Sequence, residues 1–302
     1  MHKLHTVSLE DKNWINEILS QVDFYTCEYP FGNIFSYGAK MEIKVGNIEG
    51  CLVTKCIYND YVMYCCPIGK GDMKKAIEFI LDDAKSDGRD FEIFGISPEA
   101  AEFINKHFPD IFDIGLVRDT FDYIYNSDDL INLTGKKYQP KRNHISFFMR
   151  NYNWTYERLT KDNMSECLEM SKLWLEGSLE EYREELEGEL KIIKRVFDNY
   201  DKLDYVGGVL KIDGRVVAYT MGEPASKDVF CVHIEKAFSD IRGAYPMINQ
   251  QFVKNELSCY KYINREDDTG AENLRKAKLS YYPVILAEKY EAKLKNVDSR
   301  ER

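Results

Sequence analysis

Two side chains in the second half of the chain are of types that can move a proton. His233 and Glu235 lie in the run Val229–Ala237, whose branched and aromatic residues predict a β-strand. Alternate residues of a strand share a face, so Cys231, His233 and Glu235 are expected on one side. An imidazole or a carboxylate there can take the proton of an attacking amine. The alternative is a solvated or hydrogen-bonded strand face without a catalytic role.

A short turn follows this strand and precedes a predicted helix over residues 245–257. Backbone N–H groups at the start of a helix are unpaired, and together with the helix dipole they attract an anion. Gly243 and Ala244 would let a phosphate approach the backbone, and Arg242 adds a fixed positive charge. We therefore expect Arg242, Gly243, Ala244 and Tyr245 to bind a donor that carries phosphates, although most glycine turns before helices are only turns.

Polar residues also follow the next predicted strand, Tyr260–Asn264. Ligands of open α/β sheets bind beyond the carboxyl ends of strands, which makes Asn264, Glu266 and Asp267 candidates for binding the acceptor. Capping of the following helix by Asp267 or Asp268 explains the acids equally well. Because the three acids have no histidine at a ligand spacing, we expect no metal site.

The connection between the two halves is strongly basic. It carries five fixed positive charges, a histidine and no acid, namely Lys136, Lys137, Lys141, Arg142, His144 and Arg150. The whole chain is acidic, with a net charge of −10, which argues against nucleic acid and anionic membranes as partners. The basic segment stands out from that background. It can hold the phosphates of a donor or the acceptor end of an RNA, or it can be a solvated surface.

The length of 302 residues suggests two domains of about 150 residues or one large domain. Each half shows a helix, antiparallel strands, a helix, a strand, a helix and a strand, and the Asp213-Gly214 pair predicts a tight hairpin. Residues Thr269 and Glu272 predict a capped helix that ends near Leu279. We predict a first domain over 1–135, a basic linker over 136–153 and a second domain over 154–302. One large α+β sheet domain is the alternative.

Cysteine usage and hydropathy indicate the compartment. None of the eight cysteines forms a C-x-x-C pair, the first residues do not resemble a signal peptide, and no run of 18 apolar residues occurs. We therefore expect a cytoplasmic protein with reduced thiols and no transmembrane segment.

These features together resemble a known superfamily. The order of elements resembles the GNAT acyltransferase core, namely a hairpin, a strand, an Arg-Gly-Ala turn, a helix, a strand and a helix. The Arg-Gly-Ala turn keeps one glycine, and Pro246 lies in the first turn of the helix that follows. The chain further resembles the uncharacterised bacterial family whose domain is similar to the catalytic domain of phosphatidylglycerol lysyltransferases. The segments that carry this resemblance are Val232–Ala237, Arg242–Tyr245, Ile248–Gln250, Asn264–Asp268, Leu274–Tyr281, Lys136–Tyr138 and Lys141–His144.

The resemblance implies an α+β protein of tandem GNAT-like domains, each with a mixed, mostly antiparallel central sheet flanked by helices. It implies transfer of an acyl or aminoacyl group from acyl-coenzyme A or aminoacyl-tRNA, without a prosthetic group, to an amine or hydroxyl of a small molecule or lipid headgroup. Lys141, Arg142 and His144 would help to bind the donor, and Tyr281 would protonate the leaving group. The alternative is a non-catalytic module that senses a nucleotide-bearing metabolite. The oligomeric state stays open.

Overall fold

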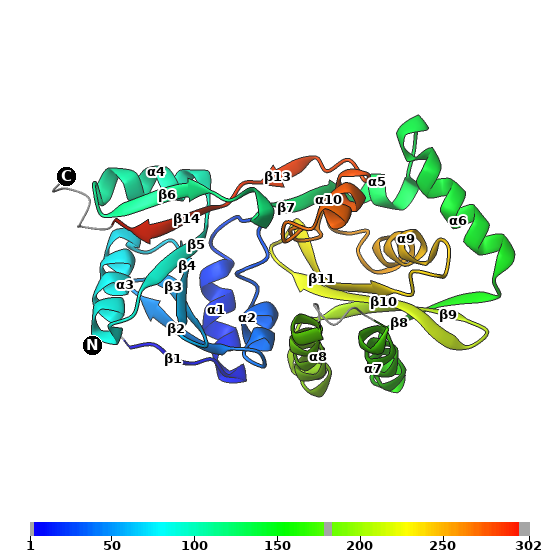
Figure 1. Ribbon diagram of the computed structural model, residues 1–302, viewed down its shortest axis with the longest axis horizontal. Helices are drawn as coiled ribbons and strands as arrows, with labels where there is room; N and C mark the ends of the chain where they lie inside the picture. The colour runs from blue at the N-terminus through cyan, green and yellow to red at the C-terminus, as the bar shows by residue number, and fades with distance from the viewer. Residues whose placement is uncertain (1–2, 178–182, 296–302) are drawn as a thin grey trace. The chain divides into compact units, whose positions relative to one another are not determined.

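The computed structural model describes residues 3–177 and 183–295, which form two compact units built on two seven-stranded sheets (Figure 1). Of the described residues, the first unit takes in 3–122, 267–272 and 286–295, and the second takes in 123–177, 183–266 and 273–285. Both sheets mix antiparallel with parallel pairs and carry helices, so the predicted α+β class is confirmed.

The sheet of the first unit is antiparallel except at one pair, β4 with β5. Its order is β1 (His5–Thr6), β2 (Glu42–Ile48), β3 (Cys51–Tyr58), β4 (Tyr61–Gly69), β5 (Phe91–Ile96), β14 (Tyr290–Leu294) and β6 (Phe112–Leu116). Helix α3 (Met73–Asp87) covers the face opposite to α1 (Lys12–Leu19) and α2 (Phe31–Tyr37), and α4 (Pro98–His107) precedes β6 (Figure 1). Helices α3 and α4 are both capped at their starts, because the side chains of Asp72 and Ser97 accept backbone N–H groups of the first turns.

The sheet of the second unit positions most of the candidate residues. Its order is β13 (Ile285–Ala287), β7 (Asp122–Asn126), β12 (Tyr262–Asn264), β11 (Val229–Ala237), β10 (Arg215–Pro224), β9 (Val206–Ile212) and β8 (Trp154–Arg158). Helix α9 (Ala244–Glu256) covers one face, while α7 (Lys161–Glu176) and α8 (Arg183–Asp198) cover the other (Figure 1). The predicted hairpin between β9 and β10 is confirmed, since Asp213 and Gly214 both have positive φ angles of 48° and 80°.

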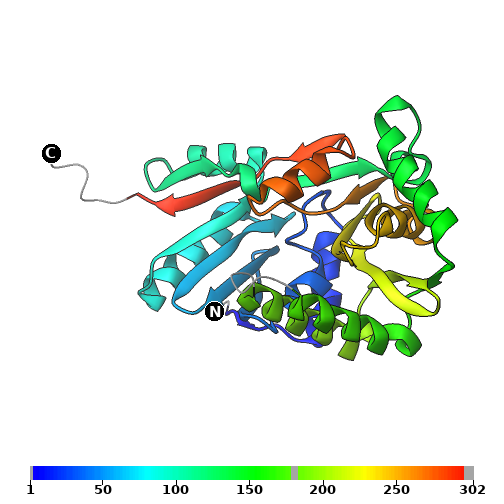
Figure 2. The same cartoon turned by 45° about the vertical axis from the view of Figure 1, so that its right-hand side comes forward.

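Each sheet contains one strand from the far part of the chain. Strand β7 follows the N-terminal sheet in sequence but pairs with β12, and β14 comes from the C-terminal part but lies between β5 and β6. Both views show the red β14 among the strands of the first sheet (Figures 1 and 2). The compact units are therefore not continuous stretches of the chain, because each takes in strands that lie far apart in the sequence.

A buried ion cluster in the first unit lies where the chain passes from this unit into β7 and where it returns to this unit before β14. Lys289, just before β14, bonds to Asp122, the first residue of β7, with Nζ 2.8 Å from Oδ1, and also to Glu28. Asp122 in turn accepts the backbone N–H of Cys27 at 2.9 Å. Since Lys289 and Asp122 are almost fully buried, each charge needs the other, and the cluster ties the two segments together.

The predicted linker 136–153 is mostly a helix of the second unit. Helix α6 (Gln139–Asn151) follows α5 (Ser127–Asn132), and its backbone crosses close to the start of α9. A Cβ atom on Gly243 would lie 2.5 Å from the carbonyl oxygen of His144 and 3.0 Å from Cβ of Phe148. Gly243 also has a φ of +91°, so both the backbone conformation and the helix contact favour glycine there. Within the described segments, none of the helices has the length and apolar character needed to cross a bilayer.

Replacing Gly243 tests this close helix contact. Gly243→Ala is expected to lower the free energy of unfolding by about 2–4 kcal/mol, because the new methyl group overlaps a backbone oxygen of α6 in addition to straining the backbone. Gly214→Ala is the matched control, since Gly214 has a similar φ of +80° but open space for at least 4 Å around the place that a methyl group would take. Gly214→Ala is expected to lower the free energy of unfolding, measured with urea, by about 1–2 kcal/mol. Equal losses for the two variants would contradict the contact.

Candidate functional site

Strands β11 and β12 run parallel and carry the candidate residues at neighbouring positions. Cys231 of β11 lies opposite Asn264 of β12, so the residues after Asn264 extend along the face that bears His233 and Glu235. The side chain of Asn264 is fully buried and its Oδ1 accepts the backbone N–H of Glu266 at 2.6 Å. Asn264, predicted to bind the acceptor, therefore shapes the turn that aims Arg265 and Glu266.

Arg265 is the centre of a buried polar cluster. Its Nη2 lies 2.6 Å from Oε1 of Glu235, and Oε2 of Glu235 accepts a hydrogen bond from Nδ2 of Asn249 on α9 at 3.1 Å. Burial alone would lower the pKa of Arg265, but the carboxylate of Glu235 raises it above the usual value, so the pair stays charged. Two atoms in this cluster are buried without a hydrogen-bond partner, namely Nη1 of Arg265 and Oδ1 of Asn249. Buried polar atoms are nearly always hydrogen-bonded, so these two atoms are suited to pair with a bound molecule or water.

Tyr281 and Lys141 complete the cluster. The guanidinium carbon of Arg265 lies 4.8 Å from the ring centre of Tyr281, and Nζ of Lys141 lies 4.0 Å from the same ring centre. Burial and the nearby Arg265 lower the pKa of Lys141 to about 8, although Glu235 acts in the opposite direction. Burial raises the pKa of Tyr281, which keeps its proton at neutral pH. The structure thus brings together the predicted donor-binding lysine and the predicted leaving-group tyrosine.

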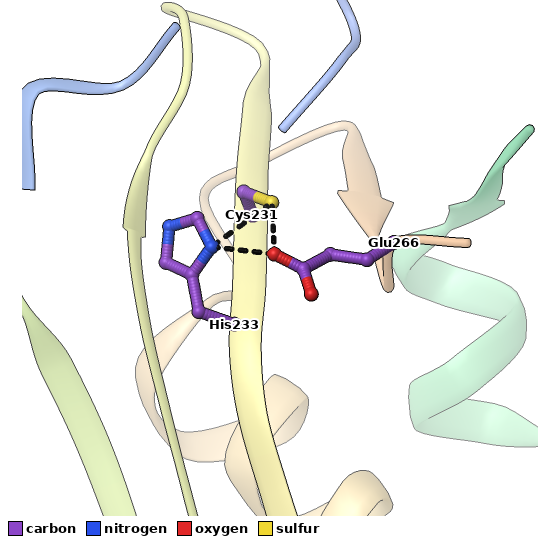
Figure 3. A group of neighbouring side chains, drawn as sticks. All are labelled: Cys231, His233 and Glu266. Atoms are coloured by element: carbon purple, nitrogen blue, oxygen red, sulfur yellow. Dashed lines mark hydrogen bonds and ion pairs between the residues drawn. The ribbon is translucent and has the colours of Figure 1, made fainter. Parts of the chain in front are cut away.

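A second cluster lies nearer to the start of β11 and consists of Cys231, His233 and Glu266 (Figure 3). Nδ1 of His233 lies 2.7 Å from Oε1 of Glu266 and 3.7 Å from Sγ of Cys231, and Nε2 lies 3.2 Å from Oε1 of Glu223. Burial by itself lowers the pKa of His233, but Cys231, Tyr205 and Glu223 raise it well above its ordinary value. An imidazole with so high a pKa already holds its proton at neutral pH and cannot accept a second one.

The predicted donor turn lies at the start of α9 as expected, but it is partly enclosed. Gly243 and Ala244 are buried, and the N–H of Ala244 donates to the carbonyl oxygen of Ile241 at 3.1 Å. The guanidinium carbon of Arg242 lies 4.3 Å from the ring centre of Phe147 on α6, while Tyr245 is exposed. Arg242 therefore adds its charge to the surface of α6.

The other two basic donor candidates differ in their surroundings. Arg142 donates from Nη1 to the carbonyl oxygens of Leu133 and Gly135, and from Nη2 to Oε1 of Gln139 at 2.5 Å, so its guanidinium closes the turn before α6. His144 is exposed on α6, and its carbonyl oxygen contacts the Gly243 position.

Asp267 belongs to the first unit, unlike the other acceptor candidates. Its Oδ1 accepts the backbone N–H of Thr269 at 3.0 Å, and Oδ1 of Asp268 accepts that of Gly270 at 3.0 Å. The predicted cap at Thr269 is wrong, because Thr269 has a φ of 48° and α10 (Glu272–Leu279) begins only at Glu272. The acids instead hold the turn that leads into α10.

Sequence reasoning missed two features of the site. The first is Arg265, which was not predicted because attention fell on its neighbours Asn264, Glu266 and Asp267. A basic residue at the end of a strand is itself a signal for binding an anion or a carbonyl group. The spacing Cys231-x-His233 on one strand face was noted, but its partner Glu266 lies 33 residues after His233 and is brought in only by the pairing of β11 with β12.

Comparison with solved structures shows the same fold in several proteins. A conserved protein of unknown function from Bacteroides thetaiotaomicron VPI-5482 superposes with a TM-score of 0.92 at 35% identity, covering 98% of this chain and 100% of that one. L-PGS from Bacillus licheniformis matches with a TM-score of 0.62 at 16% identity, covering 90% and 91%. FemX matches with a TM-score of 0.61 at 10% identity, covering 96% of each chain. A tandem GNAT protein from the clavulanic acid pathway shares the arrangement, at a TM-score of 0.53.

Sequence comparison agrees with the fold. An uncharacterised protein of Mycoplasmoides gallisepticum is 23% identical over 192 residues, covering 61% of this chain, and the match spans 59% of the length of that relative. The family model described as "Phosphatidylglycerol lysyltransferase, C-terminal" matches residues 19–293, which include both clusters described above. The predicted resemblance is confirmed, and the chain belongs to the phosphatidylglycerol lysyltransferase C-terminal family.

Proposed function

We propose that this chain transfers an aminoacyl group from aminoacyl-tRNA to an amine or hydroxyl acceptor. The observation that carries the proposal is the pair of orphaned atoms on the partners of Glu235, Nη1 of Arg265 and Oδ1 of Asn249. One is a cationic donor and the other a neutral acceptor. An aminoacyl ester has the complementary pair, a carbonyl oxygen that accepts from Arg265 and an α-ammonium that donates to Asn249. A simple acyl group has only the first of these.

The start of α9 also favours tRNA over coenzyme A as the donor. A pyrophosphate cradle needs several adjacent N–H groups that point outward. Here the N–H of Ala244 is bonded to Ile241, Pro246 has no N–H, and Gly243 is packed against α6. The enclosed turn supports a donor that is not held by its pyrophosphate.

The basic segment supplies a suitable surface for RNA. Lys136, Lys137 and Arg150 are exposed, and Arg242 is fixed against α6 by its contact with Phe147. No acidic residue occurs between Asp129 and Glu157. Phosphates can bind to this local positive surface even though the chain as a whole is acidic.

The cluster around Arg265 suggests how the transfer proceeds. The acceptor attacks the ester carbonyl, and Nη1 of Arg265 stabilises the negative charge that forms on the carbonyl oxygen. Neutral Lys141, with a pKa of about 8, takes the proton of the acceptor. Tyr281 gives its proton to the leaving ribose oxygen and recovers one from Lys141. Glu235, predicted as a base, acts instead by positioning Arg265 and Asn249, and His233, also predicted to assist, takes no part in this proton transfer.

Replacing Lys141 tests the proton transfer. In the unchanged protein kcat/KM should rise as pH increases through about 8, because only the neutral amine can accept a proton. Lys141→Met should lower kcat by about 10²-fold or more and abolish this rise. Lys136→Met removes the same charge from an exposed position of the same segment, and it should change kcat by less than about threefold while raising KM for the charged tRNA. A Lys141→Met enzyme with normal kcat and an unchanged pH profile would refute the assignment.

The donor is tested by following a label. Purified protein is incubated with labelled lysyl-tRNA or labelled acetyl-coenzyme A, together with phosphatidylglycerol vesicles or a mixture of primary amines. We expect label to leave lysyl-tRNA and to appear in an acceptor, at a rate that falls steeply with added salt. Transfer from acetyl-coenzyme A alone would contradict the donor assignment. Tight binding of either donor without any transfer would instead support a sensor and overturn the proposal.

A further inference from the structure

We propose that Cys231, His233 and Glu266 form a binding site for one zinc ion in the second unit. One sulfur, one imidazole nitrogen and one carboxylate oxygen, namely Sγ of Cys231, Nδ1 of His233 and Oε1 of Glu266, converge on a common point (Figure 3). The proposal goes beyond the transfer reaction and does not depend on it, because it concerns a different part of β11 from the Arg265 cluster.

The separations of the donor atoms suit a small tetrahedral ion. With zinc bonds of about 2.0–2.3 Å, neighbouring ligand atoms lie about 3.4–3.6 Å apart. The sulfur lies 3.7 Å from Nδ1 of His233 and 4.0 Å from Oε1 of Glu266, which is close to this geometry. The nitrogen and the oxygen are 2.7 Å apart and must separate by about 0.7 Å to admit the ion. Glu266 can make this small movement, since its side chain is 26% exposed whereas that of His233 is only 5% exposed.

The backbone holds two of the donors on one face. Cys231 and His233 are two residues apart on β11, so their side chains point to the same side of the sheet. Both are inside the fold, where their positions are fixed by packing. Glu266 enters from the turn after β12, and its backbone is set by the hydrogen bond from its N–H to Asn264. A rigid pair and one adjustable ligand form a preorganised site that can still admit an ion.

The other nitrogen of the imidazole supports the same conclusion. A histidine that binds a metal usually gives its second N–H to a carboxylate, which sets its tautomer and orientation. Nε2 of His233 lies 3.2 Å from Oε1 of the buried Glu223, yet it is buried without a hydrogen bond of good geometry. With a metal on Nδ1, the proton of the neutral imidazole would lie on Nε2, the nitrogen that faces Glu223. Glu223 is therefore the expected positioning residue.

The ligand types decide which metal fits. A thiolate excludes magnesium and calcium, which prefer oxygen ligands, while a mixed set of sulfur, nitrogen and oxygen suits zinc. Three protein ligands leave a fourth position for water. The competing description of the same atoms is a protonated His233 held between Glu223 and Glu266. Zinc would displace that proton and the thiol proton of Cys231, so binding should release protons and weaken as pH falls.

Cobalt(II) provides a direct test on the full-length protein, because a cobalt–thiolate bond gives an intense near-ultraviolet absorption band. Protein stripped with a chelator under reducing conditions is titrated with Co²⁺ and then with Zn²⁺. We expect one equivalent of Co²⁺ to bind with a thiolate band that an equivalent of Zn²⁺ removes. Cys231→Ser should abolish the band, whereas Cys259→Ser, which changes the exposed cysteine, should leave it unchanged. Glu223→Gln should keep the band but weaken metal affinity by about 10–100-fold.

Each other outcome counts against the site. The proposal is overturned if no thiolate band appears with the unchanged protein, or if the band persists in Cys231→Ser. It is also overturned if Cys259→Ser removes the band, since the exposed thiol would then be the ligand. If Cys231→Ser does not fold, Glu266→Gln replaces it, because Glu266 is partly exposed and the change is nearly isosteric. That variant must lose at least about tenfold in Co²⁺ affinity for the site to stand.

Discussion

The buried guanidinium of Arg265 is the interaction on which the candidate site depends. A cation that is removed from water is stable only beside a compensating charge, and Glu235 supplies it at 2.6 Å. Glu235 fixes Asn249 through its second oxygen, and Arg265 lies over the ring of Tyr281. Burial lowers the pKa of Lys141, and the positive charge of Arg265 lowers it further. Each residue that we place in the transfer reaction thus touches Arg265, or is set by it.

The exchange of strands explains how this cluster is built from distant parts of the sequence. Strand β7 brings Tyr125 beside β12, and its ring centre lies 5.7 Å from the guanidinium carbon of Arg265. Helix α6 brings Lys141, and the turn after α10 brings Tyr281, whose carbonyl oxygen accepts a hydrogen bond from Tyr138 at 3.0 Å. The second sheet therefore needs β7 in order to complete the wall of the site. The buried Lys289 and Asp122 pair secures the corresponding crossing in the first unit.

Much of the local structure could be predicted from the sequence, because its signals are local. The Asp213-Gly214 hairpin, the Ser97-Pro98 helix start and the strand Val229–Ala237 depend on residues within one turn or one strand. The membership of β7 and β14 could not be predicted, since it depends on pairing over more than a hundred residues. The same limit applies to the site. His233 and Glu235 could be named from alternation along the strand, whereas their partners Glu266 and Arg265 come from the end of another strand.

The two polar clusters on β11 carry different chemistry because their partners differ. Around Glu235 the partners are cations and aromatic rings, which suit a reacting ester, and burial together with Arg265 lowers the pKa of Lys141 there. Around His233 they are a thiol and two carboxylates, which suit a proton or a metal ion. The proposed transfer site and the proposed cation site thus follow each other along a single face of one strand.

The central claim is that Arg265 and burial together prepare Lys141 to exchange a proton near neutral pH. The most direct measurement is the titration of the Lys141 side chain by NMR of protein labelled with ¹³C at lysine Cε, with the signal assigned from Lys141→Arg. The account predicts a pKa of about 8 for this amine, well below its ordinary value. A titration at the ordinary value of 10.5 would contradict it.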